Sequence, residues 1–511
     1  MHSSAQRRRA VRIVTAVLVP LLAFLTLLSW SLSSAVGSSP DDDFHLASIW
    51  CGLGEREGLC ELPPESVLET NPTYRLVPAS IPNATCYAFL PDESADCWDP
   101  DQSGMAVAKR ANVEGLYPRV FYAAMSVFAS EDVVGSVVQM RIVNSAFAVA
   151  LISVTFFLLP RRLRPALIIS VVASCVPLGL FLYASANPSS WALLSAAVVW
   201  IALYGAFVVD SRPRRISLTA LALFAGIIGA GARADAAIYA AFAVVLAVFL
   251  GMKKSKAALL PAAGGLALIV LAGLFYVTSG QSAATVTGIA AAARPLTTSE
   301  HVANLLNVPN LWAGALGGWG LGWLDTLLPA AVPTIGLLVV GGVLLVGMAE
   351  ITWRRALTFI AALAAFWIVP FALLATSNAV VGTQVQPRYI MPLLIILLAV
   401  AAASPATERI WTGARVALMG AALAFTASIS LHYNIRRYTT GHDIAGIDPG
   451  REAEWWWPVA PSPFAVWVGG TIAFTVLLGI FWIMTVRPDL FRAERTVSAL
   501  SQDQRETVSE A

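Results

Sequence analysis

Long apolar runs separated by short polar connections are the main pattern along this chain. A helix needs roughly 20 consecutive apolar residues to cross the hydrocarbon core of a bilayer, so the pattern predicts about twelve membrane-spanning helices. We place these helices at 13–35, 133–159, 165–184, 190–209, 216–232, 236–251, 257–279, 331–349, 356–375, 388–404, 416–432 and 463–485. The expected fold class is therefore an all-α polytopic membrane protein.

Basic residues indicate how these helices are oriented. They recur in short clusters between the apolar runs, and the helix map places every cluster on the same side of the membrane. The clusters are RRR at 7–9, RRLR at 161–164, RPRR at 212–215, KKSK at 253–256, WRR at 353–355 and RPDLFRAER at 487–495. Because Lys and Arg are in excess in cytoplasmic loops, we expect this side to be the cytoplasm of a multi-pass plasma-membrane protein.

The map also predicts the organisation of the chain, with both termini in the cytoplasm. The expected segments are a cytoplasmic tail at 1–12, a first span at 13–35, an external loop at 36–132, a multi-span core at 133–485 with external loops at 280–330, 376–387 and 433–462, and a disordered cytoplasmic tail at 486–511. The alternative for the first apolar run is a signal peptide cleaved near SSAVG, but the run is long for that.

Composition agrees with a membrane protein. The 511 residues are 57% hydrophobic and 13% charged, with a mean hydropathy of +0.71, whereas ordinary soluble domains are about 25% charged. The net charge of +2 comes from dispersed clusters rather than from one basic patch. We therefore expect no nucleic-acid partner.

Four of the five cysteines lie in the external loop at 36–132. They are Cys51, Cys60, Cys86 and Cys97. Four cysteines in an exported loop predict two disulfides, which an oxidising compartment permits. Of the three pairings, Cys51–Cys60 with Cys86–Cys97 needs the least chain folding. A zinc site is the alternative, but the loop has no C-x-x-C motif and no paired histidine.

Ionisable residues gather at the predicted external ends of the spans, where such groups are expensive and usually have a task. They are Asp41, Asp42, Asp43 and His45 after the first span, Arg233 and Asp235 after the fifth, Asp325 before the eighth, and Arg388 with Tyr389 at the start of the tenth. The topology brings these distant positions to one membrane face. Together they offer a carboxylate base and cations that suit a phosphate.

Each of these positions also has an interpretation that needs no ligand. An acidic triplet after a span is commonly solvated, and a lone histidine is commonly a packing or solvent-facing residue. Arg233 and Asp235 can form a local ion pair, and Asp325 can cap a helix. Tyr389 can anchor the chain in the aromatic belt beside a snorkelling Arg388. Arg141, which lies within the second span, can pair with a buried carbonyl.

The acidic run carries a family resemblance. Pro40-Asp41-Asp42-Asp43-Phe44-His45 resembles the P-D-E-x-x-H element that opens the first external loop in domain-of-unknown-function family 2142, a family of bacterial membrane proteins. The segments NPSSW at 187–191, GWLDTLLP at 322–329 and VQPRYIMPL at 385–393 are similar to later motifs of that family, in the same order. The resemblance covers roughly 38–400. Asp42 stands where the family usually has glutamate, and Pro387 stands where it usually has glycine.

That family resembles C-type glycosyltransferases, which are multi-span enzymes that use polyprenyl-phosphate sugars and an acidic base in the first external loop. The resemblance implies that a sugar passes to an extracytoplasmic glycan, lipid or protein. In this chain the implied base is Asp41 or Asp42, with Asp43 and His45 shaping the loop. The remaining implied roles are phosphate binding for Arg233 and Arg388, and sugar or acceptor contacts for Asp235, Asp325 and Tyr389.

The residue types suit this reaction independently. A base must accept the proton of the attacking hydroxyl, and arginine matches the phosphate of the leaving group. Neighbouring carboxylates at 41–43 are expected to raise one another's pKa. No cofactor is expected, and a divalent metal bridging carboxylate and phosphate is the alternative. Two alternatives of other classes are a multi-span transporter, whose sites usually lie near the membrane midplane, and a non-catalytic envelope-assembly protein.

Overall fold

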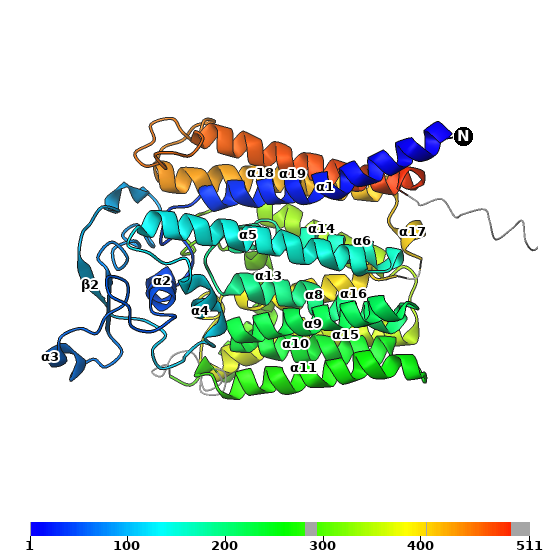
Figure 1. Cartoon of the computed structure of the whole chain (residues 1–511), viewed down its shortest axis with the longest axis horizontal. Coiled ribbons are helices and arrows are strands. Elements are labelled where there is room, and N and C mark those ends of the chain that lie inside the picture. Colours follow the sequence, from blue (N-terminus) through cyan, green and yellow to red (C-terminus); the bar gives the residue numbers. More distant parts are fainter. Residues whose placement is uncertain (1, 282–293, 405, 492–511) are drawn as a thin grey trace, which may run out of the picture.

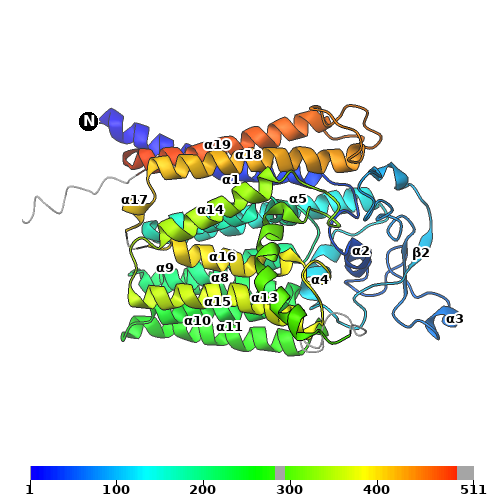
Figure 2. The same cartoon turned by 180° about the vertical axis from the view of Figure 1, so that it is seen from behind.

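The computed structural model describes residues 2–281, 294–404 and 406–491. Within these ranges nine helices are long and apolar enough to cross a membrane. They are α1 (His2–Leu32), α5 (Val133–Leu158), α8 (Ser189–Val208), α9 (Arg212–Ala232), α10 (Ala234–Gly251), α11 (Leu259–Val277, after the turn η3, Lys256–Ala258), α15 (Trp353–Thr376), α18 (Gly413–Thr439) and α19 (Pro463–Val486). They lie side by side as one bundle (Figures 1 and 2).

The other three predicted spans are also helical but shorter. The predicted spans at 331–349 and 388–404 correspond to α14 (Ala331–Gly347) and α16 (Met391–Ala402). The predicted span at 165–184 is divided into α6 (Arg164–Cys175) and α7 (Leu178–Tyr183), with Pro177 between them. Proline lacks the N–H that continues a helical ladder and its ring clashes with the preceding turn. The structure thus supports a multi-pass membrane protein, while the number of crossings stays a prediction.

Helices α8 and α16 form the centre of the bundle. Every residue of α16 is buried, and 83% of the most apolar window of α8 is buried inside the protein. Both sequences are apolar on all sides, which is typical of a helix surrounded by other helices rather than by one face of lipid or water. The central position of α16 matters for the site, because α16 follows directly after Arg388 and Tyr389.

The predicted external loop at 36–132 folds into a small subdomain at one end of the bundle (Figures 1 and 2). Its elements are α2 (Asp42–Trp50), α3 (Glu65–Leu68), β1 (Arg75–Pro78), η1 (Ala95–Cys97), β2 (Met105–Ala108) and α4 (Val120–Ser126). Strands β1 and β2 pair antiparallel. Cys51 and Cys60 lie at disulfide distance, with an S–S separation of 1.97 Å, and so do Cys86 and Cys97, at 1.98 Å. This is the pairing that the sequence predicted.

The remaining elements connect the helices. They are η2 (Arg161–Leu163), α13 (Thr298–Ala313), η4 (Gly314–Gly318), η5 (Pro387–Tyr389), α17 (Thr407–Ile410) and η6 (Pro488–Leu490). Helix α13 and η4 lie within the segment predicted as an external loop at 280–330, of which residues 282–293 are outside the described ranges. Of the tail predicted at 486–511, residues 492–511 are also outside them.

A buried arginine fixes the chain where it leaves α1. Arg141 in α5 is 2% exposed. Its Nη1 donates to the carbonyl oxygens of Ser31 and Ser34 at 3.1 and 2.5 Å, and its Nη2 donates to Ala35 O at 2.6 Å and Ser38 Oγ at 3.1 Å. The last carbonyls of a helix have no partner within the helix. A side chain from the next span supplies one for Ser31, in the last turn of α1, and binds the chain just beyond it at Ser34 and Ala35. The alternative that Arg141 pairs with buried carbonyls is confirmed.

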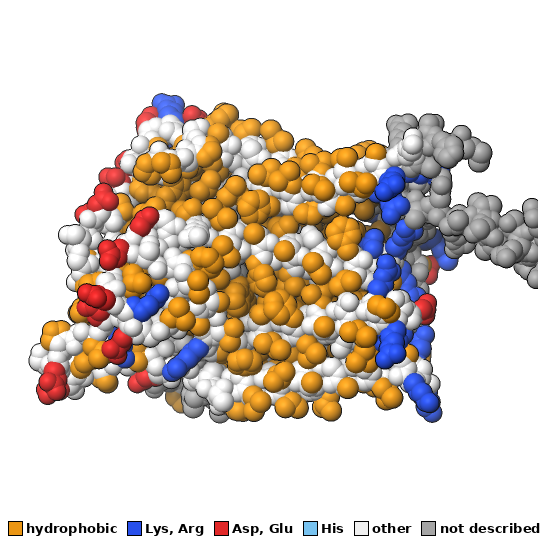
Figure 3. Space-filling view, in the orientation of Figure 1, with side chains coloured by type: hydrophobic (Ala, Val, Ile, Leu, Met, Phe, Trp, Pro, Cys, Tyr) orange, Lys and Arg blue, Asp and Glu red, His pale blue; other side chains and the backbone are white. Residues whose placement is uncertain are grey.

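The two ends of the bundle differ in charge. Figure 3 shows Lys and Arg side chains gathered at the end where α1 begins, and Asp and Glu side chains gathered around the subdomain at the opposite end. An apolar belt lies between the two ends. This distribution agrees with the orientation predicted from the basic clusters, in which the subdomain is external.

A reporter experiment tests that orientation. A topology reporter inserted after Glu350, between α14 and α15, is expected to give a cytoplasmic signal, and one inserted after Gly104 is expected to give an external signal. Gly104 suits an insertion because open space surrounds it. Signals from the opposite sides at both positions would contradict the orientation and place the acidic subdomain in the cytoplasm.

Candidate functional site

The centre of the candidate site is an ion pair between residues far apart in the sequence. Arg388 Nη2 donates to Asp41 Oδ2 at 2.5 Å, across a sequence separation of 347 residues. The Asp41 side chain is 28% exposed, whereas that of Arg388 is only 2% exposed. Asp41 precedes α2 in the left-handed conformation, with φ 62°, which Asp and Asn adopt more readily than most residues. A partly accessible carboxylate thus lies against a buried cation.

The guanidinium of Arg388 is only partly used by the protein. Its Nε and Nη1 atoms are buried and have no hydrogen-bond partner among the described residues. Several arginines in the described part of the chain have a buried Nε without a hydrogen-bond partner. Among these described arginines, only Arg388 also has a buried Nη without a partner. Leaving buried donors of a charged group unsatisfied is costly. This is the kind of arrangement that an anionic ligand relieves.

Tyr389 connects Arg388 to the second predicted phosphate-binding residue. The guanidinium carbons of Arg388 and Arg233 lie 5.0 and 5.1 Å from the centre of the Tyr389 ring. Arg233 also lies 5.7 Å from the centre of the Tyr117 ring. Cations over aromatic faces are attracted by the ring quadrupole. The two arginines therefore belong to one cluster, which the sequence predicted from topology alone.

Arg233 is more completely paired than Arg388. Its Nε and Nη2 donate to the two carboxylate oxygens of Asp235 at 2.9 and 2.7 Å, and its side chain is 5% exposed. The interpretation of Arg233 and Asp235 as a local ion pair is thus confirmed. Asp235 neutralises Arg233, so Arg233 is the weaker of the two candidates for binding a phosphate.

The structure separates the two candidate bases. Asp42 is 2% exposed and accepts a hydrogen bond from the backbone N–H of Ser39 at 2.9 Å. Burial raises the pKa of Asp42 to about 8, and the neighbouring carboxylates of Asp43 and Asp41 add less. Burial also acts to raise the pKa of Asp41, but the attraction of Arg388 and other cations outweighs it and leaves that pKa below its usual value. Repulsion within the triplet is therefore not the main cause of either shift, which corrects the expectation from the sequence.

His45 and Asp43 fix the position of α2. His45 is fully buried, and its Nδ1 lies 2.8 Å from Tyr122 Oη in α4. Burial lowers the pKa of His45 to about 3, so the imidazole is neutral at pH 7. Asp43 accepts a hydrogen bond at 2.6 Å from Arg110, whose side chain is 57% exposed. Both residues have contacts that suit the predicted role of shaping the loop.

Asp325 lies in a different cluster from the one predicted. It pairs with Arg437 of α18 at 2.7 Å, with side chains 4% and 0% exposed, and it accepts from the backbone N–H of Phe89 at 3.2 Å. Arg437 also donates to Tyr87 O at 2.7 Å. Sequence reasoning missed Arg437 because the predicted span ended at 432 and left Arg437 in the following loop, whereas α18 continues to Thr439. We assign Asp325 to the fold rather than to a sugar contact.

Three of the motifs that are separate in sequence meet at the segment before α2. Asn187 Nδ2 of NPSSW donates to Pro40 O at 2.9 Å, and Trp323 Nε1 of GWLD donates to Gly37 O at 2.8 Å. Arg388 of VQPRY pairs with Asp41 at the end of the same segment. A Cβ at Gly37, where φ is 82°, would lie 2.1 Å from Ala84 O, so only glycine fits. The motifs share one task, which is to position the acidic segment.

Metal ligands do not cluster in the described part of the chain. No group of three or more His, Cys, Asp and Glu side chains there is arranged to hold a metal ion. The alternative of a metal bridging carboxylate and phosphate therefore has no preformed protein site within these residues, and metal dependence stays untested.

Residues 24–397 match the family model described as "Predicted membrane protein (DUF2142)". The chain belongs to this family. The matched region includes Asp41, Arg233 and Arg388, and it ends within α16. No curated protein and no solved structure matches the chain. Family membership agrees with the bundle of apolar helices, and it leaves the activity to be argued from the site.

The buried ion pair between Asp325 and Arg437 provides a test, by protein stability, of the structural role assigned to Asp325. Replacing Asp325 with Asn leaves the Arg437 charge buried without its counterion, which typically destabilises a protein by about 3–5 kcal/mol. We expect a clearly lowered thermal midpoint of the purified protein. Asp43→Asn is the control, because it breaks a partly exposed pair of the kind worth about 0–1 kcal/mol. Equal midpoints for the two variants would contradict a structural role for Asp325.

Proposed function

We propose that this protein is a membrane glycosyltransferase that moves a sugar from a polyprenyl-phosphate donor to an extracytoplasmic acceptor, which is a cell-envelope glycan, lipid or protein. The observation that carries the proposal is the pair of Asp41 and Arg388. It combines an accessible carboxylate with a buried guanidinium that has unpartnered N–H groups. Arg388 lies directly before α16, at the end of the bundle that carries the subdomain. A lipid-linked phosphate at the membrane surface on that side is at the level of the pair.

The reaction assigns a task to each member of the pair. The acceptor oxygen attacks the anomeric carbon of the donor sugar, and the bond from that carbon to the phosphate oxygen breaks. The proton of the acceptor hydroxyl passes to Asp41, and the polyprenyl phosphate leaves with the bonding electrons. Arg388 stabilises the phosphate as its charge develops. No redox partner is needed.

Asp41 is preferred to Asp42 as the base because of access. Asp42 is enclosed by protein, whereas Asp41 is partly exposed. In the free protein Arg388 holds the pKa of Asp41 below its usual value, which makes Asp41 a weak base. A donor phosphate that binds Arg388 competes with Asp41 for the guanidinium and adds a negative charge nearby. Both effects raise the pKa of Asp41, so donor binding itself activates the base.

The neighbouring aromatic rings suit the rest of the donor. Tyr389 lies between the two arginines, and Tyr117 lies over Arg233. We assign the Tyr389 hydroxyl, which is 3.3 Å from Arg388 Nη2, to a contact with sugar or phosphate. Arg233, which is paired with Asp235, also packs against that ring. Asp235 is 18% exposed and is the remaining polar group for a sugar hydroxyl.

Substitution of the pair tests the proposal. Asp41→Asn is expected to lower the transfer rate by about 10²–10⁴-fold, the usual contribution of a positioned base, while donor binding is retained. Arg388→Gln is expected to weaken donor binding as well. Transfer from radiolabelled polyprenyl-phosphate sugars measures the first effect, and equilibrium binding of the same lipids measures the second.

Asp101→Asn is the matched control, because Asp101 is an exposed carboxylate of the same subdomain. Equal yields and thermal midpoints for the variants exclude misfolding as the cause of lost transfer. Full activity of Asp41→Asn would show that Asp41 is not the base. Absence of transfer by the wild-type protein with every polyprenyl-phosphate sugar tried would favour the transporter and assembly alternatives.

The pH dependence tests activation of the base by the donor. Transfer needs deprotonated Asp41, so the rate rises as the pH passes upward through its pKa. The kcat/KM profile for the donor reports the free enzyme, in which Arg388 lowers that pKa, and the kcat profile reports the donor complex. We therefore expect the acidic limb of kcat at a higher pH than that of kcat/KM. Coincident limbs would contradict competition between phosphate and Asp41 for Arg388.

A further inference from the structure

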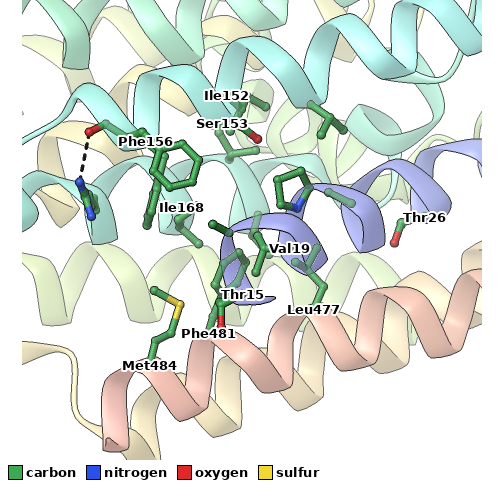
Figure 4. Close-up of a pocket in the computed structure, with 18 of the residues that line it drawn as sticks. Thr15, Val19, Thr26, Ile152, Ser153, Phe156, Ile168, Leu477, Phe481 and Met484 are labelled. Carbon is green, nitrogen blue, oxygen red and sulfur yellow. Dashed lines mark hydrogen bonds between the residues drawn. The ribbon is translucent and has the colours of Figure 1, made fainter. Parts of the chain in front are cut away.

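A hollow lies in the basic half of the bundle, opposite the subdomain. It has a volume of about 930 Å³ and is lined mainly by apolar side chains of α1, α5, α6, α7 and α19. Figure 4 shows Val19 of α1, Ile152 of α5 and Leu477 of α19 pointing into it. We call this hollow the basal groove. It shares no residue with the site around Asp41.

One mouth of the basal groove is strongly basic. The arginines that line it come from α1, from the connection before α6 and from α9, and they are Arg8, Arg9, Arg12, Arg161, Arg164 and Arg214. No Asp or Glu of the described part lines the groove. Within the described ranges no carboxylate forms an ion pair with Arg12, Arg161 or Arg214. Cations gathered in this way repel one another unless an anion lies among them.

Helix α1 leaves its apolar side uncovered along the groove. Only 11% of its most apolar window is buried, the smallest share among the nine long helices of the described residues. Pro20 lies inside α1 and lines the groove. A proline removes one helical hydrogen bond and bends the axis, and Figure 1 shows the N-terminal part of α1 turning away from the bundle. The bend opens the groove toward the membrane.

The length of the groove fits a lipid chain. Its lining on α1 extends from Arg8 to Leu27, and the part that follows the arginines, from Ile13 to Leu27, is roughly 21 Å long at the rise of an α-helix. One leaflet of a bilayer contributes about half of the ~30 Å hydrocarbon core. An acyl chain can therefore lie along the apolar walls with its phosphate among the arginines. A free phosphate satisfies the arginines alone and leaves the walls uncovered.

We propose that the basal groove binds an anionic phospholipid of the leaflet at the basic end of the bundle. The headgroup phosphate lies between Arg12, Arg161 and Arg214, and an acyl chain lies between α1 and α19. Arg164 is a wall residue rather than a headgroup ligand. Its Nε and Nη2 donate to Leu159 O and Phe157 O at 3.2 and 3.1 Å, and its guanidinium covers the Phe156 ring. This inference is independent of the proposed transfer reaction.

Lipid binding by the purified full-length protein tests the inference. Dioleoyl phosphatidylglycerol and dioleoyl phosphatidylcholine are added in turn to protein in a neutral detergent, and bound lipid is counted by native mass spectrometry. The wild type is expected to retain the anionic lipid in preference to the zwitterionic one. Arg12→Gln, Arg161→Gln and Arg214→Gln, singly and combined, are expected to weaken retention of the anionic lipid by roughly fivefold for each arginine.

Arg409→Gln is the matched control. Arg409 lies in α17 at the same end of the bundle, its side chain is 83% exposed, and it does not line the groove. Retention lost equally in Arg409→Gln, or no preference of the wild type between the two lipids, would overturn the proposal. Stabilisation by inorganic phosphate equal to that by the anionic lipid would assign the arginines to a soluble anion instead. If removing lipid made the wild type dimerise and the triple variant did not dimerise, the groove would instead be a contact with a second copy of the chain, and the proposal would be wrong.

Discussion

The site depends first on how the chain leaves its first helix. Arg141 in α5 donates to the carbonyl group of Ser31 in the last turn of α1 and to those of Ser34 and Ala35 in the segment that follows. A buried arginine can bind several carbonyl groups at once because its guanidinium presents five N–H donors in a fixed plane. The segment that follows is held at Gly37 and Pro40 by Trp323 and Asn187. Asp41 is thereby placed at a fixed point beside the bundle rather than on a free loop.

Two ion pairs at this end of the molecule differ in how the terminal nitrogens of the arginine are used. In the described part of the chain both arginines have a buried Nε without a partner, and Asp325 Oδ1 is also buried without one. Arg437 donates from both terminal nitrogens to Asp325 and to backbone carbonyls, so it ties α18 to the subdomain. Arg388 has its one carboxylate contact with Asp41 and an unpartnered Nη1 within the described residues. A pair that is buried on both sides, and whose arginine has both Nη atoms bound within the protein, stabilises one conformation. A pair with donors to spare, next to a partly exposed carboxylate, is suited to exchange its partner for a ligand.

The two ends of the bundle differ in the sign of their surface charge and in how their cations are paired. At the end predicted to be external, Arg233 and Arg388 are paired with carboxylates and lie over the Tyr389 ring, and acidic residues are prominent on the surface. At the other end Arg12, Arg161 and Arg214 line a hollow and form no ion pair with a carboxylate in the described part of the chain. The first arrangement suits reversible contact with one phosphate at a defined point. The second suits retention of anionic lipid, because unpaired cations near a membrane surface attract its phosphates.

Local sequence properties determined the helices, the charge asymmetry and the cysteine pairs. Spans depend on the apolar character of consecutive residues, and the pairs Cys51–Cys60 and Cys86–Cys97 are separated by only 9 and 11 residues. The motifs that resemble those of the family also indicated which residues, at the ends of the spans predicted to be external, belong to one site. The tertiary structure alone decided that Asp41 contacts Arg388 while Asp42 is enclosed, that Asp235 occupies Arg233, and that Arg437 is the partner of Asp325. Burial and contact between residues hundreds of positions apart are set by how the helices pack, and neighbouring residues in the sequence carry no record of that packing.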